Sequence, residues 1–258
     1  MVISRVWLDG EFQPDDVRAR ATIERRLELA NGCFETLLVR DGIAHELAIH
    51  LERLAMSVSV TVDRAAIKSA VRQLTAECSG VARLRIVVSE SPYPGTAITV
   101  TDYVVPGPAD LRDGVSVTVL SAPTVERRDP SRARKTLEWR RRAADLNSSD
   151  AFECLLLNDA NRVAEGLRSN VIAVVDGRPV TPALDEGCLP GTVRRRLVES
   201  GAVAEGVVDS RALHGGELML ANSLIGVVPV AEVDGRPMIV GQWAKELRSR
   251  WTETCANG

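Results

Sequence analysis

Lysine is scarce in this sequence of 258 residues: lysine and arginine together number 32, yet only Lys68, Lys135 and Lys245 are lysines. Histidine is also scarce, with three residues that form no HExxH pair. The five cysteines are scattered and no CxxC occurs, which argues against both a disulfide framework and a zinc site. Any chemistry that needs a lysine amine therefore has three candidates.

Strong net charge and long apolar runs are lacking as well. The formal net charge is −3, so nothing favours nucleic acid or an anionic membrane as a partner. No segment approaches the roughly 20 apolar residues that a membrane-spanning helix needs, and "MVISRVWLDGEF" does not have the pattern of a secretory signal. With 45% hydrophobic and 26% charged residues, we expect a folded cytoplasmic protein.

What is present first is an α+β pattern in residues 1–106. The dipeptides Asp9-Gly10 and Asp41-Gly42 predict tight turns between strands. The segments "ARLRIVVSE" and "TAITVTDYVVP" predict two more strands, joined by the turn "SPYPG". Helical spacing of apolar residues predicts helices over 46–60 and 63–77. These elements predict a small N-terminal domain with a mainly antiparallel sheet.

The stretch "PGPADLRDG" (106–114) is rich in proline, glycine and aspartate, and is a linker candidate. A strand is predicted after it over 115–121, and we expect residues 107–122 to connect the two domains. Residues 123–258 then alternate strands with turns, including a hairpin at Asp176-Gly177, and predict a larger C-terminal domain. Helical spacing predicts helices over 136–149, over 191–200 and at the C-terminus. The length of the chain is sufficient for two such domains.

Two charged residues, Lys135 and Glu165, lie in sequence contexts that suggest a functional role rather than simple exposure to solvent. Lys135 ends the basic run "RRDPSRARK", where like charge opposes its ammonium form; in a cleft its pKa would fall, as a nucleophilic lysine requires. Glu165, in "VAEGLRSNVIAVV", precedes an apolar strand, and a buried carboxylate is costly unless it is paired. The alternatives are a solvated basic run for Lys135 and a solvated loop for Glu165.

Two further segments could bind a phosphate group. "LPGTVRR" begins a helix with a glycine, and the N-terminus of such a helix presents N–H groups and a positive dipole end. "ANSLIGVVP" follows a strand, so Asn222 and Ser223 project from its end. The alternatives are a plain helix cap and a plain turn. Taken together, a lysine, a carboxylate and phosphate donors are what pyridoxal phosphate requires.

On these residues the sequence resembles the class IV, or fold-type IV, pyridoxal-phosphate enzymes, which include D-amino-acid and branched-chain aminotransferases and aminodeoxychorismate lyase. The segments that carry the resemblance run in order along the chain: "ERRLELANGCFETLLVRDG", "HLERL", "RKTLEW", "EGLRSNV", "LPGTVRR" and "ANSLIGVVPVAEVDGR". The resemblance implies a smaller N-terminal α/β sandwich, a larger C-terminal β-barrel-like domain with flanking helices, and a homodimer.

The resemblance also implies roles for individual residues. Lys135 takes the place of the Schiff-base lysine, which is also the acid–base group, and Glu165 takes the place of the glutamate that meets the pyridine nitrogen. The remaining residues implied to bind the cofactor are Arg53, Ser169, Asn170, Thr192, Val193, Asn222 and Ser223. Thr192 lies one position earlier than the hydroxyl of the family motif, so Val193 would offer only its backbone N–H.

The reaction implied by the resemblance is transamination between a D-amino acid and an α-keto acid. A primary amine donor, aminodeoxychorismate lyase activity (4-aminobenzoate and pyruvate as products) and a non-catalytic relative are the alternatives. The turn "SPYPG" is too short to carry the arginine-bearing loop found there in the lyases and in the usual D-amino-acid aminotransferases, so other residues must contact the substrate. The candidates are Arg26, Glu35, Arg83, Arg85, Arg134, Trp139 and Arg168.

Overall fold

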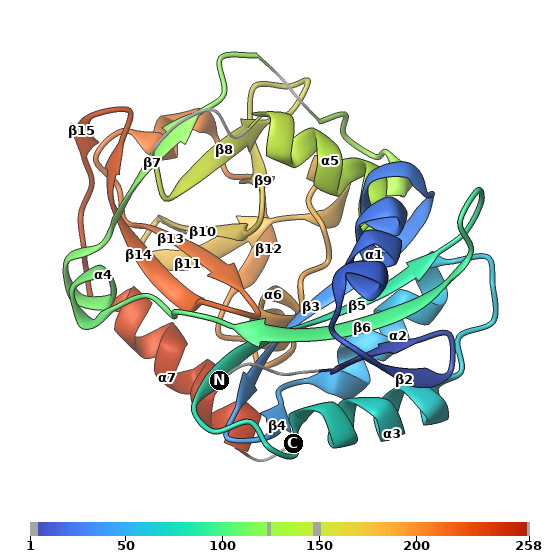
Figure 1. The fold of residues 1–258 in the computed structure, drawn as a ribbon. Coiled ribbons are helices and arrows are strands. Elements are labelled where there is room, and N and C mark those ends of the chain that lie inside the picture. The colour runs from blue at the N-terminus through green and yellow to red at the C-terminus, as the bar shows by residue number, and fades with distance from the viewer. Residues whose placement is uncertain (1–4, 123–124, 147–150, 257–258) are drawn as a thin grey trace. The chain divides into compact units, whose positions relative to one another are not determined.

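The computed structural model describes residues 5–122, 125–146 and 151–256, and its contacts divide them into two compact units (Figure 1). Unit 1 contains the described residues up to Val105 together with Arg134–Ala144. Unit 2 contains Pro106–Ala133 and the described residues from Asp145 onwards. The first division lies next to the predicted boundary at residue 106. Arg134–Ala144, which the sequence places in the C-terminal domain, packs in unit 1 instead.

Unit 1 is built on a six-stranded sheet with the order β2-β1-β6-β5-β3-β4, in which every neighbouring pair is antiparallel. Asp9-Gly10 and Asp41-Gly42 have positive φ angles and form the predicted hairpin turns, which confirms those two assignments. The strands are β1 (Arg5–Leu8), β2 (Glu11–Pro14), β3 (Gly32–Arg40), β4 (Ile43–Ala44), β5 (Val81–Ser89) and β6 (Gly95–Asp102).

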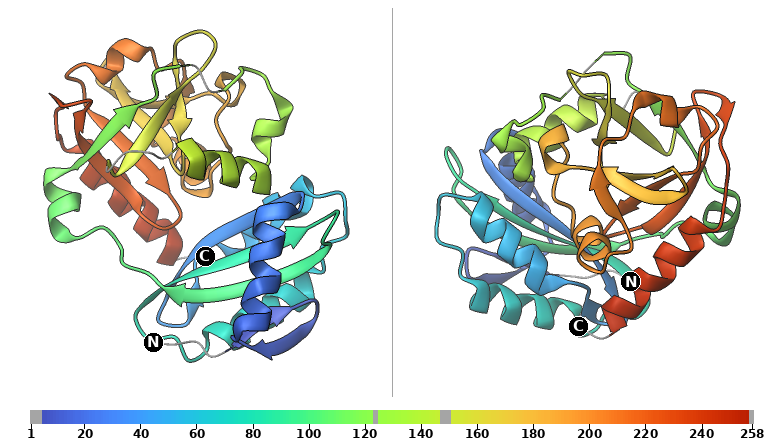
Figure 2. Two further views of the ribbon diagram at one scale, coloured as in Figure 1. Left: turned by 45° about the horizontal axis from the view of Figure 1, so that its top comes forward. Right: turned by 180° about the vertical axis from the view of Figure 1, so that it is seen from behind.

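Helices cover both faces of this sheet (Figure 2). Helices α2 (Leu47–Ser57) and α3 (Arg64–Thr75) pack on one face and confirm the two predicted helices. Helix α1 (Val17–Leu29) packs on the other face and was not predicted. Its apolar side is narrow, with Ile23 and Leu27 buried among arginines and glutamates, so the helical period is weak.

The segment that carries Lys135 belongs to unit 1 because it pairs with the beginning of β3. Cys33 and Thr136 form an antiparallel bridge, and the backbone N–H of Phe34 donates to the carbonyl of Lys135 at 3.0 Å. Helix α5 (Leu137–Leu146) then begins, with Leu137 fully buried in the core beside α1. The predicted end of this helix at residue 149 lies outside the described residues.

Unit 2 contains a curled nine-stranded sheet (Figure 1). Strand β9 lies at one end of the strand order, and the chain continues from it directly to β10, near the other end. The order is β12-β11-β10-β13-β14-β7-β8-β9, with β15 paired to β14. The strands are β7 (Val115–Val119), β8 (Glu153–Leu157), β9 (Val163–Gly166), β10 (Asn170–Val175), β11 (Arg178–Pro182), β12 (Ala204–Gly206), β13 (Leu218–Asn222), β14 (Gly226–Val233) and β15 (Arg236–Pro237). The curled sheet agrees with the predicted barrel-like domain, and the turn at Asp176-Gly177 is confirmed.

The segment predicted as a connector over 107–122 belongs to unit 2, and its predicted strand is present as β7 (Val115–Val119). Helix α4 (Pro108–Asp113) occupies its beginning, with the side chain of Asp110 accepting from the N–H of Gly107 at 2.7 Å. Strand β7 follows and lies between β14 and β8, with Val115 and Val117 buried in the core of unit 2. Proline, glycine and aspartate here cap a short helix rather than form a linker.

Two helices pack on the outer face of the curled sheet. Helix α6 (Thr192–Glu199) buries Val193 and Leu197, and helix α7 (Trp243–Ala256) buries Ala244 and Leu247, all against β10, β13 and β14. A separate apolar cluster fills the inside of the sheet. Among the described residues, no helix is long and apolar enough to cross a membrane.

Candidate active site

Lys135 is less exposed to solvent than the other two lysines. Its ammonium nitrogen lies 5.0 Å from the centre of the Phe34 ring, and the side chain is half-buried, whereas Lys68 and Lys245 are exposed on α3 and α7. A cation against an aromatic face is a specific contact. Nearby on α5, the backbone N–H of Trp139 donates to the hydroxyl of Thr136 at 3.0 Å. The sequence grouped Trp139 with the substrate candidates, and the structure leaves it half-buried on that helix.

Arg53 lies inside unit 1 in an ion pair with Glu35. Its Nε and Nη2 donate to the two carboxylate oxygens of Glu35 at 2.8 and 2.6 Å, and His50 Nδ1 lies 2.7 Å from Glu35 Oε2. Burial alone would raise the pKa of Glu35, but Arg53 and His50 hold it well below its usual value. Glu35 was a candidate substrate contact; the structure instead buries its carboxylate as the partner of Arg53.

Replacing Glu35 by glutamine is expected to lower the free energy of unfolding by about 3 kcal/mol, because it leaves the Arg53 guanidinium buried without an anion. Because the folded pKa of Glu35 is depressed, its stabilisation is present above the unfolded value near 4.5 and is lost as the pH falls below it. Urea unfolding of wild type and E35Q between pH 3 and 7 should therefore show a gap that narrows below about pH 4.5.

The control is Glu77→Gln, which changes an exposed carboxylate after α3 and should shift stability by less than about 0.5 kcal/mol. Equal, pH-independent losses in E35Q and E77Q would contradict the role of the Glu35–Arg53 pair.

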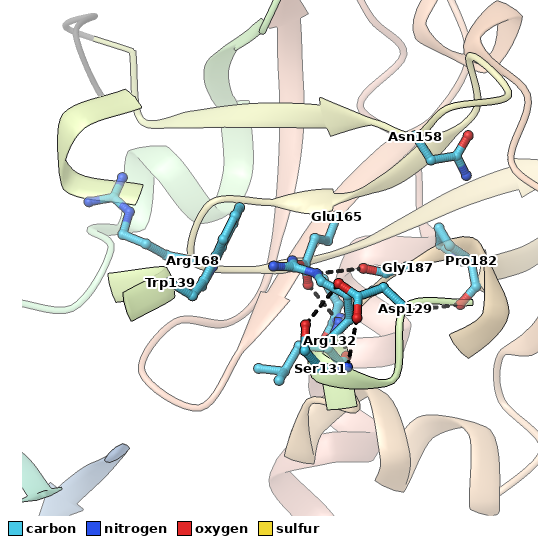
Figure 3. A network of polar contacts seen from close by, with 12 residues as sticks. Asp129, Ser131, Arg132, Trp139, Asn158, Glu165, Arg168, Pro182 and Gly187 are labelled. Atoms are coloured by element: carbon cyan, nitrogen blue, oxygen red, sulfur yellow. Dashed lines mark hydrogen bonds and ion pairs between the residues drawn. The ribbon is translucent and has the colours of Figure 1, made fainter. Parts of the chain in front are cut away.

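Glu165 is a buried carboxylate of unit 2, and its partner is Arg132 (Figure 3). Arg132 Nη2 donates to Glu165 Oε1, and the backbone N–H of Leu189 donates to Oε2 at 2.8 Å. Burial raises the pKa of Glu165 to about 6, while Arg132 and the Leu189 amide oppose that rise. The cost of placing a carboxylate beside an apolar strand is thus offset by an arginine and a backbone amide.

Arg132 is the site residue that sequence reasoning missed. It lies in the 3₁₀ turn Pro130–Ala133, where Asp129 accepts from the N–H and the hydroxyl of Ser131, both at 2.8 Å (Figure 3). Its Nε donates to the carbonyl of Gly187 at 3.1 Å. The run "RRDPSRARK" offers four arginines with no periodic pattern, so no local signal selects Arg132.

The motifs "EGLRSNV" and "LPGTVRR" meet in unit 2. Asn170 Nδ2 donates to the carbonyl of Leu189 at 2.8 Å, and the backbone N–H of Leu189 donates to the Glu165 carboxylate. Ser169 is buried and donates to Glu153 at 2.9 Å. Glu153, a second buried carboxylate absent from the predicted set, accepts from Ser169 and from two backbone amides and braces the turn that follows Glu165.

The predicted phosphate residues lie at a helix start and at a turn. Thr192 and Val193 are buried at the N-terminus of α6, and its N-cap Gly191 has no side chain to cap the helix. Such a helix start favours an anion. Asn222 instead accepts from the N–H of Leu224 and of Ile225, at 2.8 and 3.0 Å, and forms the turn between β13 and β14. Its neighbour Ser223 lies in the same turn, half-buried.

Replacing Gly191 by alanine is expected to weaken pyridoxal phosphate binding about tenfold. A Cβ at this position would lie 2.0 Å from Asn170 Oδ1, and displacing Asn170 disturbs Leu189 and through it Glu165. Overpacking of this kind costs about 1–3 kcal/mol, and about 1.4 kcal/mol of that cost falling on the cofactor-bound form corresponds to about tenfold in Kd. The measurement is the Kd for the cofactor by fluorescence titration.

Gly107 provides a matched control, because it is also an extended N-cap glycine and a Cβ there meets its nearest atom at 3.6 Å. G107A should bind the cofactor like the wild type. If G191A also bound it like the wild type, the contact between the two motifs would not matter for the cofactor.

Two of the candidate substrate arginines are engaged by the strands of unit 1. Arg26 is buried, and its Nη2 binds Asp9 Oδ2 at 2.5 Å. Arg83 Nη2 donates to the hydroxyl of Thr101 on the neighbouring strand at 3.2 Å. Both side chains therefore have structural partners within the sheet.

Two further candidates are exposed. Arg134 Nε donates to the carbonyl of Ser57 at 2.6 Å. Arg168 Nη2 donates to the carbonyl of Phe152 at 2.6 Å, and its Nε lies 3.6 Å from Glu153. Arg85, the remaining arginine candidate, is half-buried on β5.

The residue types described above are those that pyridoxal phosphate requires. Unit 1 holds a half-buried lysine, and unit 2 holds a buried carboxylate beside a helix that begins with glycine. A carboxylate with a pKa near 6 suits a protonated pyridine nitrogen, since the two groups share a proton and neutralise each other. No cluster of three metal-ligating side chains occurs among the described residues.

The family model named amino-transferase class IV matches residues 32–233. The chain belongs to the class IV aminotransferases. The enzymes of this family use pyridoxal 5'-phosphate, so the match agrees with the lysine, the carboxylate and the helix start described above. The resemblance read from the six ordered motifs is thereby confirmed at the level of family and cofactor.

The relatives of this class IV enzyme have different names. The bifunctional aminodeoxychorismate lyase / D-amino acid transaminase of Mycobacterium tuberculosis is 28% identical, over 90% of this chain and 91% of its own. The structure of 4-amino-4-deoxychorismate lyase from Pseudomonas aeruginosa is 27% identical with a TM-score of 0.76, covering 96% and 98%. Branched-chain amino acid aminotransferase of Escherichia coli shares the fold, with a TM-score of 0.77 at 19% identity, covering 98% and 95%.

Proposed function

We propose that this class IV enzyme transfers an amino group between a D-amino acid and an α-keto acid, with pyridoxal phosphate attached to Lys135. The observation that carries the proposal is the placement of Lys135, half-buried against Phe34, while the other two lysines are exposed. The choice of a D-amino acid is supported by the transaminase activity in the name of the M. tuberculosis relative. A homodimer and a cytoplasmic location complete the proposal.

In the proposed reaction the chain's residues have separate tasks. When bound, pyridoxal phosphate supplies an electron-withdrawing pyridinium ring that stabilises negative charge at the substrate Cα. Glu165 holds the proton at the pyridine nitrogen, and Arg132 and the Leu189 amide hold Glu165 in place. The N-terminus of α6 would bind the phosphate. Arg53 is assigned to the phosphate by its motif alone, because its Nε and Nη2 are engaged by Glu35. Once released from the cofactor by the incoming amine, Lys135 Nζ would take the proton from Cα as a general base and return it on the cofactor side.

Aminodeoxychorismate lyase is the second candidate. It is favoured by the 27% identity over nearly the whole of the P. aeruginosa enzyme. The same lysine and carboxylate would serve it, so these residues do not separate the two reactions. The β5–β6 hairpin is short, with Ser89 paired to Gly95, which leaves no room for the longer loop expected in that enzyme.

The test is to load the purified protein with pyridoxal phosphate and to measure two products. Pyruvate formed from D-alanine with 2-oxoglutarate as acceptor supports the transaminase. 4-Aminobenzoate formed from aminodeoxychorismate supports the lyase, and both products together support a bifunctional enzyme. Turnover of L-leucine without turnover of D-alanine would contradict the D-amino-acid assignment.

A further inference from the structure

Arg85 has no anionic partner in the described part of the chain. It lies on β5 opposite Thr36 of β3 and is half-buried. Its Nε is buried and has no hydrogen-bond acceptor. Burial, reinforced by the charges of Arg83 and Arg140, lowers the pKa of Arg85 to about 10, so the side chain is still a cation at neutral pH. A buried donor left without an acceptor is costly and marks a site where a ligand can supply one.

Arg85 lies on the same face of the unit 1 sheet as Lys135. On β5, Leu84 and Ile86 pack towards α2 and α3, whereas Val87 packs towards α1. Alternation along a strand places Arg85 on the α1 face with Val87. The centre of the Arg85 guanidinium lies 5.9 Å from the centre of the Phe34 ring, and Lys135 Nζ lies 5.0 Å from the same ring.

We propose that Arg85 binds the α-carboxylate of the amino donor and of the keto-acid acceptor, while Lys135 acts at the adjacent carbon. The inference rests on the proposed function and narrows its substrates to those with a free α-carboxylate. A guanidinium binds a carboxylate through two parallel N–H···O bonds, and Arg85 has such donors to offer. This requirement separates amino and keto acids from primary amines.

The other candidate arginines fit this role less well. Arg26 already pairs with Asp9 and is buried behind it, and Arg168 and Arg134 are exposed and donate to backbone carbonyls. Arg83 points to the hydroxyl of Thr101. The Phe34 ring holds the Arg85 guanidinium by a cation–π contact, and that contact uses the ring-facing side of the guanidinium without consuming its N–H donors.

The experiment compares wild type, R85Q and R85K, each loaded with pyridoxal phosphate. The first readout is the Kd for propionate, an unreactive carboxylate, by calorimetry. The second is KM and kcat for D-alanine and for 2-oxoglutarate. In R85Q we expect Kd and both KM values to rise about 100-fold, with a smaller change in kcat. R85K keeps the positive charge but loses the two parallel N–H donors of the guanidinium, so we expect Kd and both KM values to rise about tenfold.

Arg40→Gln is the matched control, because Arg40 is exposed at the end of β3 in the same sheet; it should behave like the wild type. Thermal unfolding and the cofactor's visible band show whether R85Q is folded and loaded. If R85Q is folded and loaded, a propionate Kd and KM values within twofold of those of the wild type would overturn the role of Arg85. A wild-type protein that takes up no cofactor, or that turns over no amino acid, would instead contradict the proposed function. The comparison of propionate Kd values between wild type and R85Q would still decide the inference about Arg85.

Discussion

Lys135→Ala is expected to abolish the visible absorption of attached cofactor and to lower kcat by about 10³-fold or more. The loss of a general base alone costs about 10²–10⁴-fold, and here the same amine also anchors the cofactor. The backbone at this position is held independently of the side chain, since the N–H of Phe34 donates to the Lys135 carbonyl and Thr136 bridges to Cys33. The variant should therefore fold, and its defect should be chemical.

Two controls make this test specific. Lys68→Ala removes an exposed lysine from α3 and should leave spectrum and turnover unchanged. Borohydride reduction of the wild type followed by peptide mapping should locate the cofactor on the peptide that contains Lys135. A cofactor found on another lysine, or full activity in K135A, would be incompatible with the assignment.

Glu165→Gln is expected to lower kcat by about 10²–10³-fold, with a smaller effect on cofactor uptake. An amide cannot hold the pyridine nitrogen in its protonated form, and removing one fixed charge that stabilises a transition state costs about 10²–10³ in kcat. The substitution also leaves Arg132 without its carboxylate, so some loss of stability accompanies the loss of rate. The measurement is single-turnover kinetics with saturating D-alanine.

The matched control is Glu186→Gln. Glu186 is another buried carboxylate of unit 2, paired with Arg162 at 2.9 Å and with Asn158 at 2.7 Å. Its loss should lower the free energy of unfolding without lowering kcat. If E165Q and E186Q lost kcat equally, the effect of Glu165 would be one of stability, and its proposed contact with the pyridine nitrogen would be unsupported.

Local chemistry explains which parts of the fold were predictable. The Asp-Gly turns at residues 9, 41 and 176 have the positive φ angles that such pairs favour. Helix α3 begins where Asp63 accepts from the N–H of Ala66, as an N-cap should. By contrast, α1 buries few apolar residues, so its helical period is weak in the sequence. Its N-cap is nevertheless regular, since the Asp16 carboxylate accepts from the backbone N–H of Ala19.

Errors arose where partners distant in sequence decide the structure. Lys135 joins unit 1 because its segment pairs with β3, about a hundred residues earlier in the chain. The sequence predicts that Glu165 needs a partner and the resemblance supplies the pyridine nitrogen, but no local pattern selects Arg132. The same limit applies to the substrate: five arginines were equivalent in the sequence, and only their contacts distinguish Arg85.

The most direct test of the account is a half-reaction. The protein is loaded with pyridoxal phosphate, freed of excess cofactor, and mixed with D-alanine in the absence of any keto acid. The account predicts that the visible band is lost and that equimolar pyruvate appears, with neither change in K135A. A loaded wild-type protein that keeps its visible band and releases no pyruvate would contradict the proposed transfer of an amino group from a D-amino acid.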